Sequence, residues 1–178
     1  MAGRQSMAEE LRFAQLVSES RWGGLITPQM LVEMSTINAA RNIGLDGELG
    51  SIEVGKKADL VVITGDPARP YQSLIESTPA NVRLVLVNGV VLYGDVNLQP
   101  PAPIAPGCEL ADMCGCAKFM CVATPGGTPA QLLGQTYAEI ESNLVGALAT
   151  YDANGWPGVN PQPAVPLSPM SPIYRCRE

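Results

Sequence analysis

Gly50-Ser-Ile-Glu-Val-Gly-Lys-Lys-Ala-Asp-Leu-Val-Val-Ile63 is the stretch that decides the fold. Its first half is a charged turn bounded by glycines, and its second half is a short apolar run rich in β-branched residues, the pattern of a fully buried strand. A second run of this kind, Leu84–Val87, is followed by Asn88-Gly89, a dipeptide that readily takes the positive φ angles of a type I′ turn. We therefore expect a β-hairpin over residues 83–93 in a sheet that also contains residues 60–63.

Two amphipathic helices are expected before this stretch. Ser6 begins the first helix as the N-cap of a capping box, and Gly23-Gly24 ends it. Thr27 is the expected N-cap of the second helix, Pro28 occupies its first position, and Gly44 lies where a left-handed C-cap is wanted. The predicted buried face of the second helix comprises Met30, Leu31, Met34 and Ile37.

The composition changes after residue 98. Four prolines within residues 100–106 are typical of a linker, four of the five cysteines follow, and one more helix is expected near residues 129–151 with Thr128 as its N-cap. Its apolar stripe, expected to cover this protein's own core, comprises Leu133, Tyr137, Ile140, Leu144 and Leu148. We therefore divide the chain into residues 1–48, 49–98 and 99–178.

The cysteines are candidates for disulfide bonds. They are Cys108, Cys114, Cys116, Cys121 and Cys176. Their spacing lacks the paired C-x2-4-C knuckles of a zinc site, so disulfide bonds are favoured over free buried thiols, and a metal site is the third alternative. A link from Cys108 or from Cys121 to Cys176 would tie the last residues back to the cluster.

The composition argues against several classes of function. The 178 residues carry a net charge of −6, which disfavours nucleic acid or an anionic membrane surface as a partner. No stretch approaches the roughly 20 apolar residues of a membrane span, and the first residues lack the apolar core of a signal peptide. The chain contains no histidine, so a Ser or Cys nucleophile lacks its usual base. The sequence leaves the localisation open between cytoplasmic and exported.

Residues 50–57 also nearly match the phosphate-binding loop G-x4-G-K-[ST]. The last position is Lys57, so the hydroxyl that would bind magnesium is absent. A strand is expected next, where a phosphate site needs the N-terminus of a helix. We interpret these residues as a tight turn.

Residues 7–95 resemble the C-terminal part of the amidohydrolase superfamily, in the branch of imidazolonepropionase-like and prolidase-like enzymes. The resemblance rests on Thr36-Ile-Asn-Ala-Ala-Arg41 with Gly44-Leu45, on residues 50–63 and on the hairpin, in that order. It implies an α+β fragment of a (β/α)8 amidohydrolase. Residues 1–48 would be its last barrel helices, residues 49–98 strands of its small β-sandwich, and the rest a Pro/Cys-rich extension with one helix.

In that family the metal ligands, mostly histidines, lie upstream of the matched part, and Asp46, Asp59 and Asp66 are in the wrong places to replace the family's aspartate. The resemblance implies Zn or another divalent metal and a small-molecule substrate, with an amide or cyclic amide bond, for a bacterial parent enzyme. It implies no catalytic, cofactor-binding or metal-binding residue in this chain. We therefore expect a structural portion that is inactive alone, has the N-terminal barrel portion as its partner and oligomerises through exposed apolar faces.

Two other hypotheses stay open. The chain can be a standalone binding or assembly module, derived from an amidohydrolase tail and stabilised by disulfides, with an ordered cysteine cluster and a native start at Met1. Alternatively, it is a subunit that completes a barrel supplied by a histidine-rich polypeptide.

Overall fold

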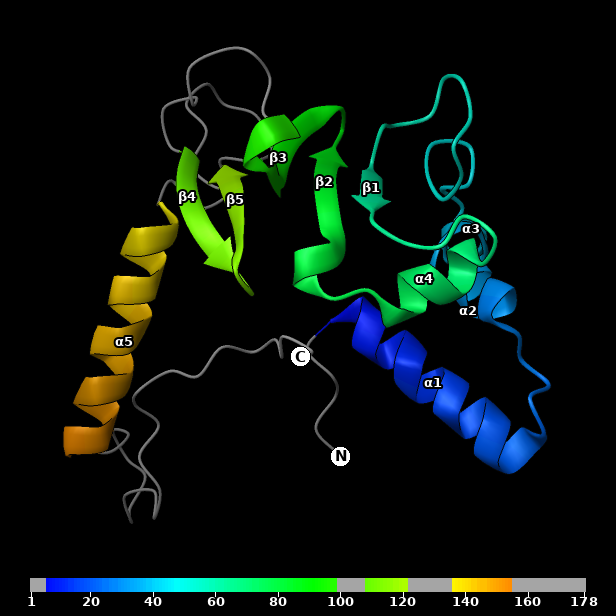
Figure 1. The fold of residues 1–178 in the computed structure, drawn as a ribbon, viewed down its shortest axis with the longest axis horizontal. Coiled ribbons are helices and arrows are strands. Elements are labelled where there is room, and N and C mark those ends of the chain that lie inside the picture. Colours follow the sequence, from blue (N-terminus) through cyan, green and yellow to red (C-terminus); the bar gives the residue numbers. More distant parts are fainter. Residues whose placement is uncertain (1–5, 99–107, 122–135, 155–178) are drawn as a thin grey trace.

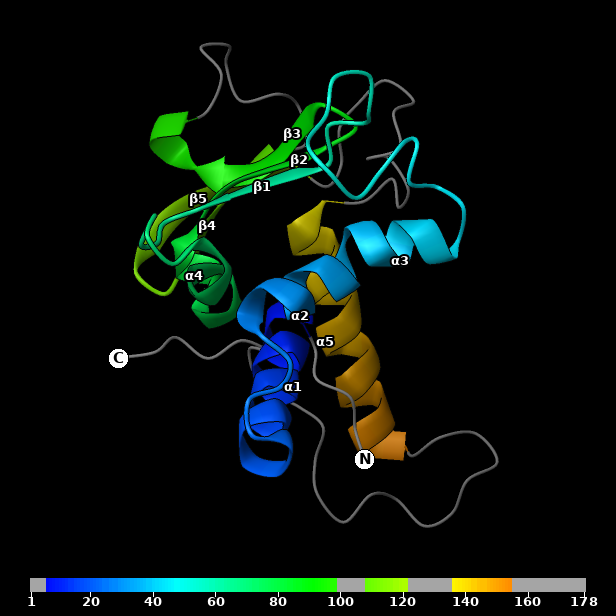
Figure 2. The same cartoon turned by 90° about the vertical axis from the view of Figure 1, so that its right-hand side faces the viewer.

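A computed structural model describes residues 6–98, 108–121 and 136–154 of the chain. These residues form two layers, an antiparallel sheet and a group of α-helices to one side of it (Figures 1 and 2), which confirms the expected α+β class. The strands, in the order β1-β2-β3-β5-β4 across the sheet, are β1 (Leu60–Ile63), β2 (Val82–Val87), β3 (Val90–Asp95), β4 (Cys108–Met113) and β5 (Cys116–Cys121). The α-helices are α1 (Met7–Trp22), α2 (Pro28–Ser35), α3 (Ile37–Asn42), α4 (Pro70–Glu76) and α5 (Tyr137–Asn154), and the short 3-10 helices are Pro79–Asn81 and Val96–Leu98.

Helix α1 begins and ends where the sequence predicts. The Ser6 hydroxyl accepts a hydrogen bond from the backbone N–H of Glu9 (3.3 Å), and Gly23 takes the left-handed conformation (φ 61°) that closes the helix. The buried hydroxyl of Ser18 then accepts from the N–H of Ile26 (2.9 Å) and donates to the carbonyl of the same residue (3.1 Å). These two bonds hold the loop that leads to α2 against α1.

The single helix predicted from Thr27 is two helices in the structure. The Thr27 cap is confirmed, because its hydroxyl accepts from the N–H of Met30 (3.3 Å). The helix nevertheless stops at Ser35, and Thr36 leaves the helical region (φ −123°, ψ −100°). The hydroxyls of Ser35 and Thr36 both donate to the carbonyl of Val32 (2.9 and 2.7 Å). Side-chain bonds of this kind compete with the helical backbone ladder, which explains the break.

The end of α3 confirms the predicted role of Gly44. This glycine is left-handed (φ 72°), and its N–H donates to the carbonyl of Arg41 (3.1 Å). The next N–H, of Leu45, reaches the carbonyl of Ala40 (2.9 Å). The two bonds make a complete Schellman motif.

Helices α1, α2 and α4 pack around a small apolar core that contains Leu11, Leu31 and Ile75. The prediction that Met30 and Met34 are also buried is wrong, since they are 44% and 56% exposed. Because the face of α2 that carries Leu31 turns toward α1 and α4, these two methionines lie outside the contact.

The hairpin of β2 and β3 is confirmed, with Asn88 (φ 50°) and Gly89 (φ 78°) in the positive-φ conformation of a type I′ turn. Strand β1 is confirmed too and pairs antiparallel with β2. Its predicted full burial is wrong, because Val61 and Val62 are 51% and 47% exposed. β1 is an edge strand of the sheet formed by the described residues, so its side chains lack neighbours on one side.

The Pro/Cys-rich extension contributes two strands that the sequence did not indicate. Strands β4 and β5 form a hairpin, and β5 pairs with β3 through Tyr93↔Met120, Gly94↔Phe119 and Asp95↔Lys118. The turn of this hairpin has positive φ angles at Cys114 and Gly115 (60° and 78°). A Cys-Gly pair is an unusual sequence for such a turn, since Asn and Gly are preferred there.

Cys108 and Cys121 form a disulfide bond across the open end of this hairpin. The expectation that one of them bonds to Cys176 is therefore wrong, because the β4–β5 pairing places the two opposite each other. Cys176 lies outside the described residues. Cys116, also a candidate for a disulfide, is free and exposed.

Helix α5 begins at Tyr137, after a capping box in which the Thr136 hydroxyl accepts from the Glu139 N–H (3.2 Å) and the Glu139 carboxylate accepts from the Thr136 N–H (2.7 Å). The predicted N-cap at Thr128 lies outside the described residues. No residue of α5 is buried, so the prediction that its stripe covers the core is wrong. In Figure 1 the helix lies near the β4 end of the sheet, away from the α1–α2–α4 group.

Among the described helices, none is both long and apolar enough to cross a membrane.

Candidate functional site

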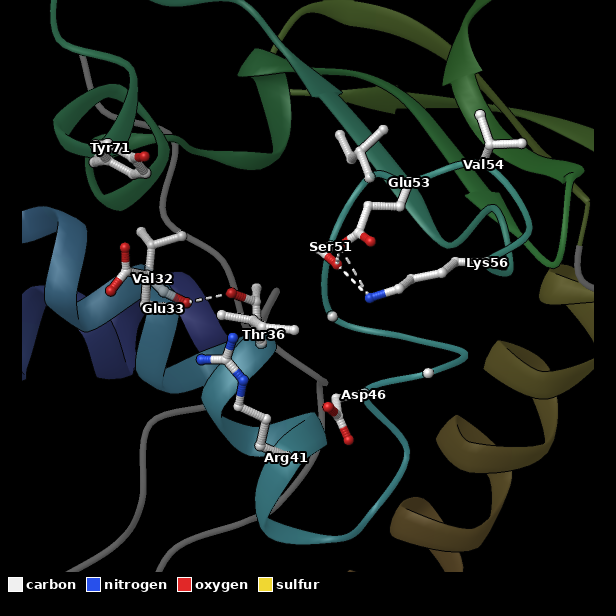
Figure 3. A pocket seen from close by; sticks show the side chains of 14 residues that line it. Val32, Glu33, Thr36, Arg41, Asp46, Ser51, Glu53, Val54, Lys56 and Tyr71 are labelled. Atoms are coloured by element: carbon white, nitrogen blue, oxygen red, sulfur yellow. Dashed lines mark hydrogen bonds and ion pairs between the residues drawn. The ribbon is translucent and has the colours of Figure 1, made fainter.

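The segment after α3 folds over that helix and forms one wall of an open pocket of about 880 Å³. Helices α2 and α3 supply the other wall, and Figure 3 shows polar side chains from both walls around the space. The polar residues that line it include Glu33, Thr36, Arg41, Asp46, Lys56 and Tyr71. The pocket is thus made from the stretches that carry the resemblance described above.

Gly50 joins the two walls of this pocket. It has a φ of 90°, and a Cβ atom built there would lie 2.8 Å from Cβ of Ala40 and 2.9 Å from Cα of Ile37. Ala40 is itself buried. The small residues of α3 and the glycine of the following loop therefore form one close contact, which a side chain at position 50 would prevent.

Within the loop, Ser51, Glu53 and Lys56 form a closed set of polar contacts (Figure 3). The ammonium of Lys56 donates to Oγ of Ser51 (2.6 Å) and to the Glu53 carboxylate (3.1 Å), and the Ser51 hydroxyl donates to the same carboxylate (2.5 Å). The Ser51 hydroxyl and then Lys56 lower the pKa of Glu53. A Ser–Lys catalytic pair needs the amine to accept the serine proton. Lys56 is instead a donor to Ser51, so the set acts as a clasp on the turn.

The next residues agree with the interpretation of a tight turn rather than a phosphate-binding loop. The ammonium of Lys57 pairs with Glu48 (2.7 Å), and the N–H of Lys57 donates to the Glu48 carbonyl (2.9 Å). Strand β1 follows, so no helix N-terminus faces the glycines of the loop.

Asp59 connects this loop to the β2–β3 hairpin. Its carboxylate accepts from the N–H of Asn88 (2.6 Å), and the neighbouring carbonyl of Ala58 accepts from the N–H of Gly89 (3.0 Å). Both amides of the hairpin turn are therefore satisfied by the segment that leads into β1. The Lys-Ala-Asp sequence thus stabilises the position of a turn that lies about thirty residues further along the chain.

The change Asp59→Ala is expected to lower the free energy of unfolding by about 1 kcal/mol, because it removes a charge-assisted hydrogen bond at an exposed turn. Urea unfolding followed by circular dichroism measures this loss. Asp46→Ala is the matched control, since the Asp46 side chain makes no hydrogen bond to any described residue. Equal unfolding free energies for the two variants would show that the contact of Asp59 with the turn contributes nothing.

A second polar cluster, which the sequence reasoning missed, joins the extension to the sheet. The Lys118 side chain is 1% exposed, and its ammonium donates to the carbonyls of Val82 (2.7 Å) and Ala80 (3.2 Å) and to the carboxylate of Asp95. Arg83 donates to the other oxygen of Asp95. In the described part of the chain, no buried polar side-chain atom lacks a hydrogen-bond partner. The only sequence signal was a lysine within the otherwise apolar stretch Ala117–Cys121.

This cluster makes the stability of the fold dependent on pH. The hydrogen bond from Lys118, followed by that from Arg83, lowers the pKa of Asp95 below its usual value of 3.8. Because the unfolded chain then binds this proton more readily than the folded chain, the stabilisation is complete above about pH 5 and is lost as the pH falls through the folded pKa.

We expect the loss of unfolding free energy between about pH 7 and about pH 3 to be larger for the unchanged protein than for Asp95→Asn. Urea unfolding at the two pH values measures the difference. The comparison also removes the contributions of Glu48, Glu53 and Asp66, whose pKa values are lowered as well. Parallel pH profiles for the two proteins would contradict the assignment to Asp95.

Residues 1–92 match the model of the amidohydrolase family, which is more than half of the chain. This chain belongs to the amidohydrolase family. The family match contains α1 to β2 and the first residues of β3, with the pocket and the Asp59 contact. Strands β4 and β5, Lys118 and α5 lie beyond it.

Three relatives illustrate the similarity. The chain is 35% identical over 98 residues to a 5-methylthioadenosine/S-adenosylhomocysteine deaminase of Thermoanaerobacter pseudethanolicus, covering 53% of this chain and 23% of that protein. It is 37% identical over 82 residues to an S-triazine hydrolase of Gordonia rubripertincta, covering 42% and 17%. It is 42% identical over 76 residues to an imidazolonepropionase of Shouchella clausii, covering 42% and 16%. The chain therefore spans less than a quarter of the length of these amidohydrolase-family relatives.

The residues of this chain do not fit the metal of the amidohydrolase family. Among the described residues, no three His, Cys, Asp or Glu side chains form a group that could hold a metal ion, and the sequence has no histidine. The three aspartates considered above have separate positions. Asp46 lines the pocket, Asp59 binds the hairpin turn, and Asp66 accepts from the Ala68 N–H (2.9 Å) and from Arg69 (3.1 Å) before α4.

Proposed function

We propose that this chain supplies the C-terminal structural portion of a metal-dependent amidohydrolase that hydrolyses C–N bonds in a small molecule, and that it is inactive alone. The observation that carries this proposal is the role of the family-matched residues. Gly50, Lys56 and Asp59 make contacts within the protein that build the pocket wall and place the hairpin. None of these contacts leaves a nucleophile beside a base.

The names of the relatives support the reaction class. They are deaminases, a triazine hydrolase and imidazolonepropionases, and these names describe hydrolytic chemistry at C–N bonds. In the proposed arrangement the metal ligands and the substrate contacts come from an N-terminal barrel portion. The helices α1 to α3 of this chain would be the last helices around that barrel, and its strands would belong to the adjoining β-sandwich.

The surface of α1 and α2 supports a missing partner. Leu16 and Trp22 of α1 are 58% and 54% exposed, Leu25 after it is 74% exposed, and Met34 of α2 is 56% exposed. Contiguous apolar surface of this kind marks a contact site or a tendency to aggregate. We therefore expect the isolated chain to bind a hydrophobic dye and to self-associate.

A specific observation favours one alternative function, a standalone binding or assembly module. The hairpin of β4 and β5 lies outside the family match, carries the Cys108–Cys121 disulfide and contributes buried Lys118 and Phe119 to the sheet. Such a covalently closed edge would let residues 6–121 fold as a unit without a barrel.

The test uses the whole chain together with the Thermoanaerobacter relative shortened by its matching C-terminal segment. We expect this chain alone to bind no stoichiometric zinc and to release no ammonia from methylthioadenosine, and to form a stable complex with the shortened relative in analytical ultracentrifugation. Leu16→Glu should weaken the complex, and Glu19→Gln on the same helix is the control. A dye-free, cooperatively melting monomer that ignores the shortened relative would contradict the proposal and support the module.

A further inference from the structure

The disulfide Cys108–Cys121 lies next to the residue that holds the first turn of α5. Cys108 is the first residue of β4, and Glu109 follows it. The Glu109 carboxylate accepts from the N–H of Tyr137 (2.5 Å) and from that of Ala138 (3.3 Å). A carboxylate at this place satisfies free amides of the first helical turn and is attracted by the helix dipole.

The position of Glu109 depends on an edge strand. β4 is the outermost strand on its side of the described sheet and pairs with β5 alone, in the register Cys108↔Cys121 and Glu109↔Met120. The first residues of an edge strand open more easily than those of a central one, since their pairing is on one side only. The disulfide holds the Cys108↔Cys121 pair, which is the end of the ladder, and it therefore limits the opening of the neighbouring pair.

The other end of the same hairpin does not need this bond. There β5 is held by buried Lys118 and Phe119, which contact β2 and β3. Loss of the disulfide should consequently affect the start of β4 more than the pairing of β5 with β3. The covalent bond and the anchor of α5 are thus coupled through two consecutive residues.

We propose that the Cys108–Cys121 disulfide is a redox-sensitive latch for α5. While the bond is closed, Glu109 stays at the N-terminus of α5. When the bond is reduced, the start of β4 opens and that helix end is released from the sheet. In the reduction a dithiol supplies two electrons and two protons, the Sγ–Sγ bond breaks, Cys108 and Cys121 become thiols, and the dithiol becomes a disulfide.

Hydrogen exchange of the whole chain, measured by mass spectrometry, tests the latch. The double variant Cys108→Ser/Cys121→Ser mimics the open state without a reductant and leaves the other cysteines unchanged. We expect the amides of residues 137–140 to exchange about tenfold faster than in the unchanged protein, while those of β2 and β3 keep their rates. Dithiothreitol added to the unchanged protein should produce the same increase at residues 137–140. Cys116→Ser, which alters the free exposed cysteine, is the control and should leave these rates as they are.

A third variant separates the latch from a general loss of stability. Glu109→Ala removes the anchor and keeps the disulfide, so residues 137–140 should exchange fast, and adding the two serine changes to it should cause no further increase. The proposal is overturned by unchanged exchange of α5 in the double variant, by additive effects of the anchor and the disulfide, or by equal loss of protection in β2 and β3.

Discussion

Replacing Lys118 by methionine is expected to lower the free energy of unfolding by about 3 kcal/mol. The ammonium is buried and donates to Asp95 and to the carbonyls of Ala80 and Val82. Methionine fills a similar volume but leaves the carboxylate with Arg83 as its remaining partner and leaves two carbonyls without this donor. Removal of one member of a buried ion pair is costly, because the other charge stays away from water. Urea unfolding followed by circular dichroism measures the change.

Lys57→Met is the matched control. It makes the same chemical change in a lysine whose ion pair with Glu48 is half exposed on both sides. Water and salt screen such a pair, so its removal should leave the unfolding curve nearly unchanged. Similar curves for the two variants would mean that the buried cluster does not join the extension to the sheet. We also expect Lys118→Met to increase hydrogen exchange in β5, whereas Lys57→Met should not.

The second large effect is expected for Gly50→Ala, at about 3 kcal/mol or more of unfolding free energy. Two causes add at this position. The φ of 90° is unfavourable for a residue with a side chain, and the new Cβ would meet Cβ of Ala40 and Cα of Ile37 at less than 3 Å. The loop and α3 must move apart to accommodate it, which would open the pocket between them. Thermal unfolding and urea unfolding both measure the loss.

Gly55→Ala separates the two causes. Gly55 has nearly the same φ, 94°, but no atom lies within 4 Å of a Cβ built there. This variant should therefore cost about 1–2 kcal/mol, the backbone strain alone. If both alanine variants lost the same stability, the close contact of Gly50 with α3 would have no energetic role.

Local sequence signals predicted the elements whose hydrogen bonds lie within a few residues. The Ser6 and Thr27 caps, the left-handed Gly44 and the Asn88-Gly89 turn are each decided by neighbours in the chain. The same limit explains an error. Thr36 was placed inside a helix because apolar spacing continues through it, whereas hydroxyl bonds to the Val32 carbonyl break the helix there.

The candidate site was predictable only in part. The order of the motifs was enough to place the chain in the amidohydrolase family, which the family match shows. It did not show that Gly50 touches Ala40 or that Asp59 binds the turn at Asn88, since each contact joins segments that are apart in sequence. The resemblance marked these positions, and the tertiary structure explains them.

The sequence by itself determined the helix ends, the β2–β3 hairpin, the family and the absence of histidine ligands, because these depend on residue identity and on bonds between close neighbours. The tertiary structure decided that Cys108 bonds to Cys121 and that the extension completes the sheet through Lys118. The bond from Lys118 to Val82 crosses 36 residues. A lysine in a cysteine-rich segment becomes a buried ion-pair partner only because β5 lies beside β3, which brings its ammonium to Asp95 and away from water.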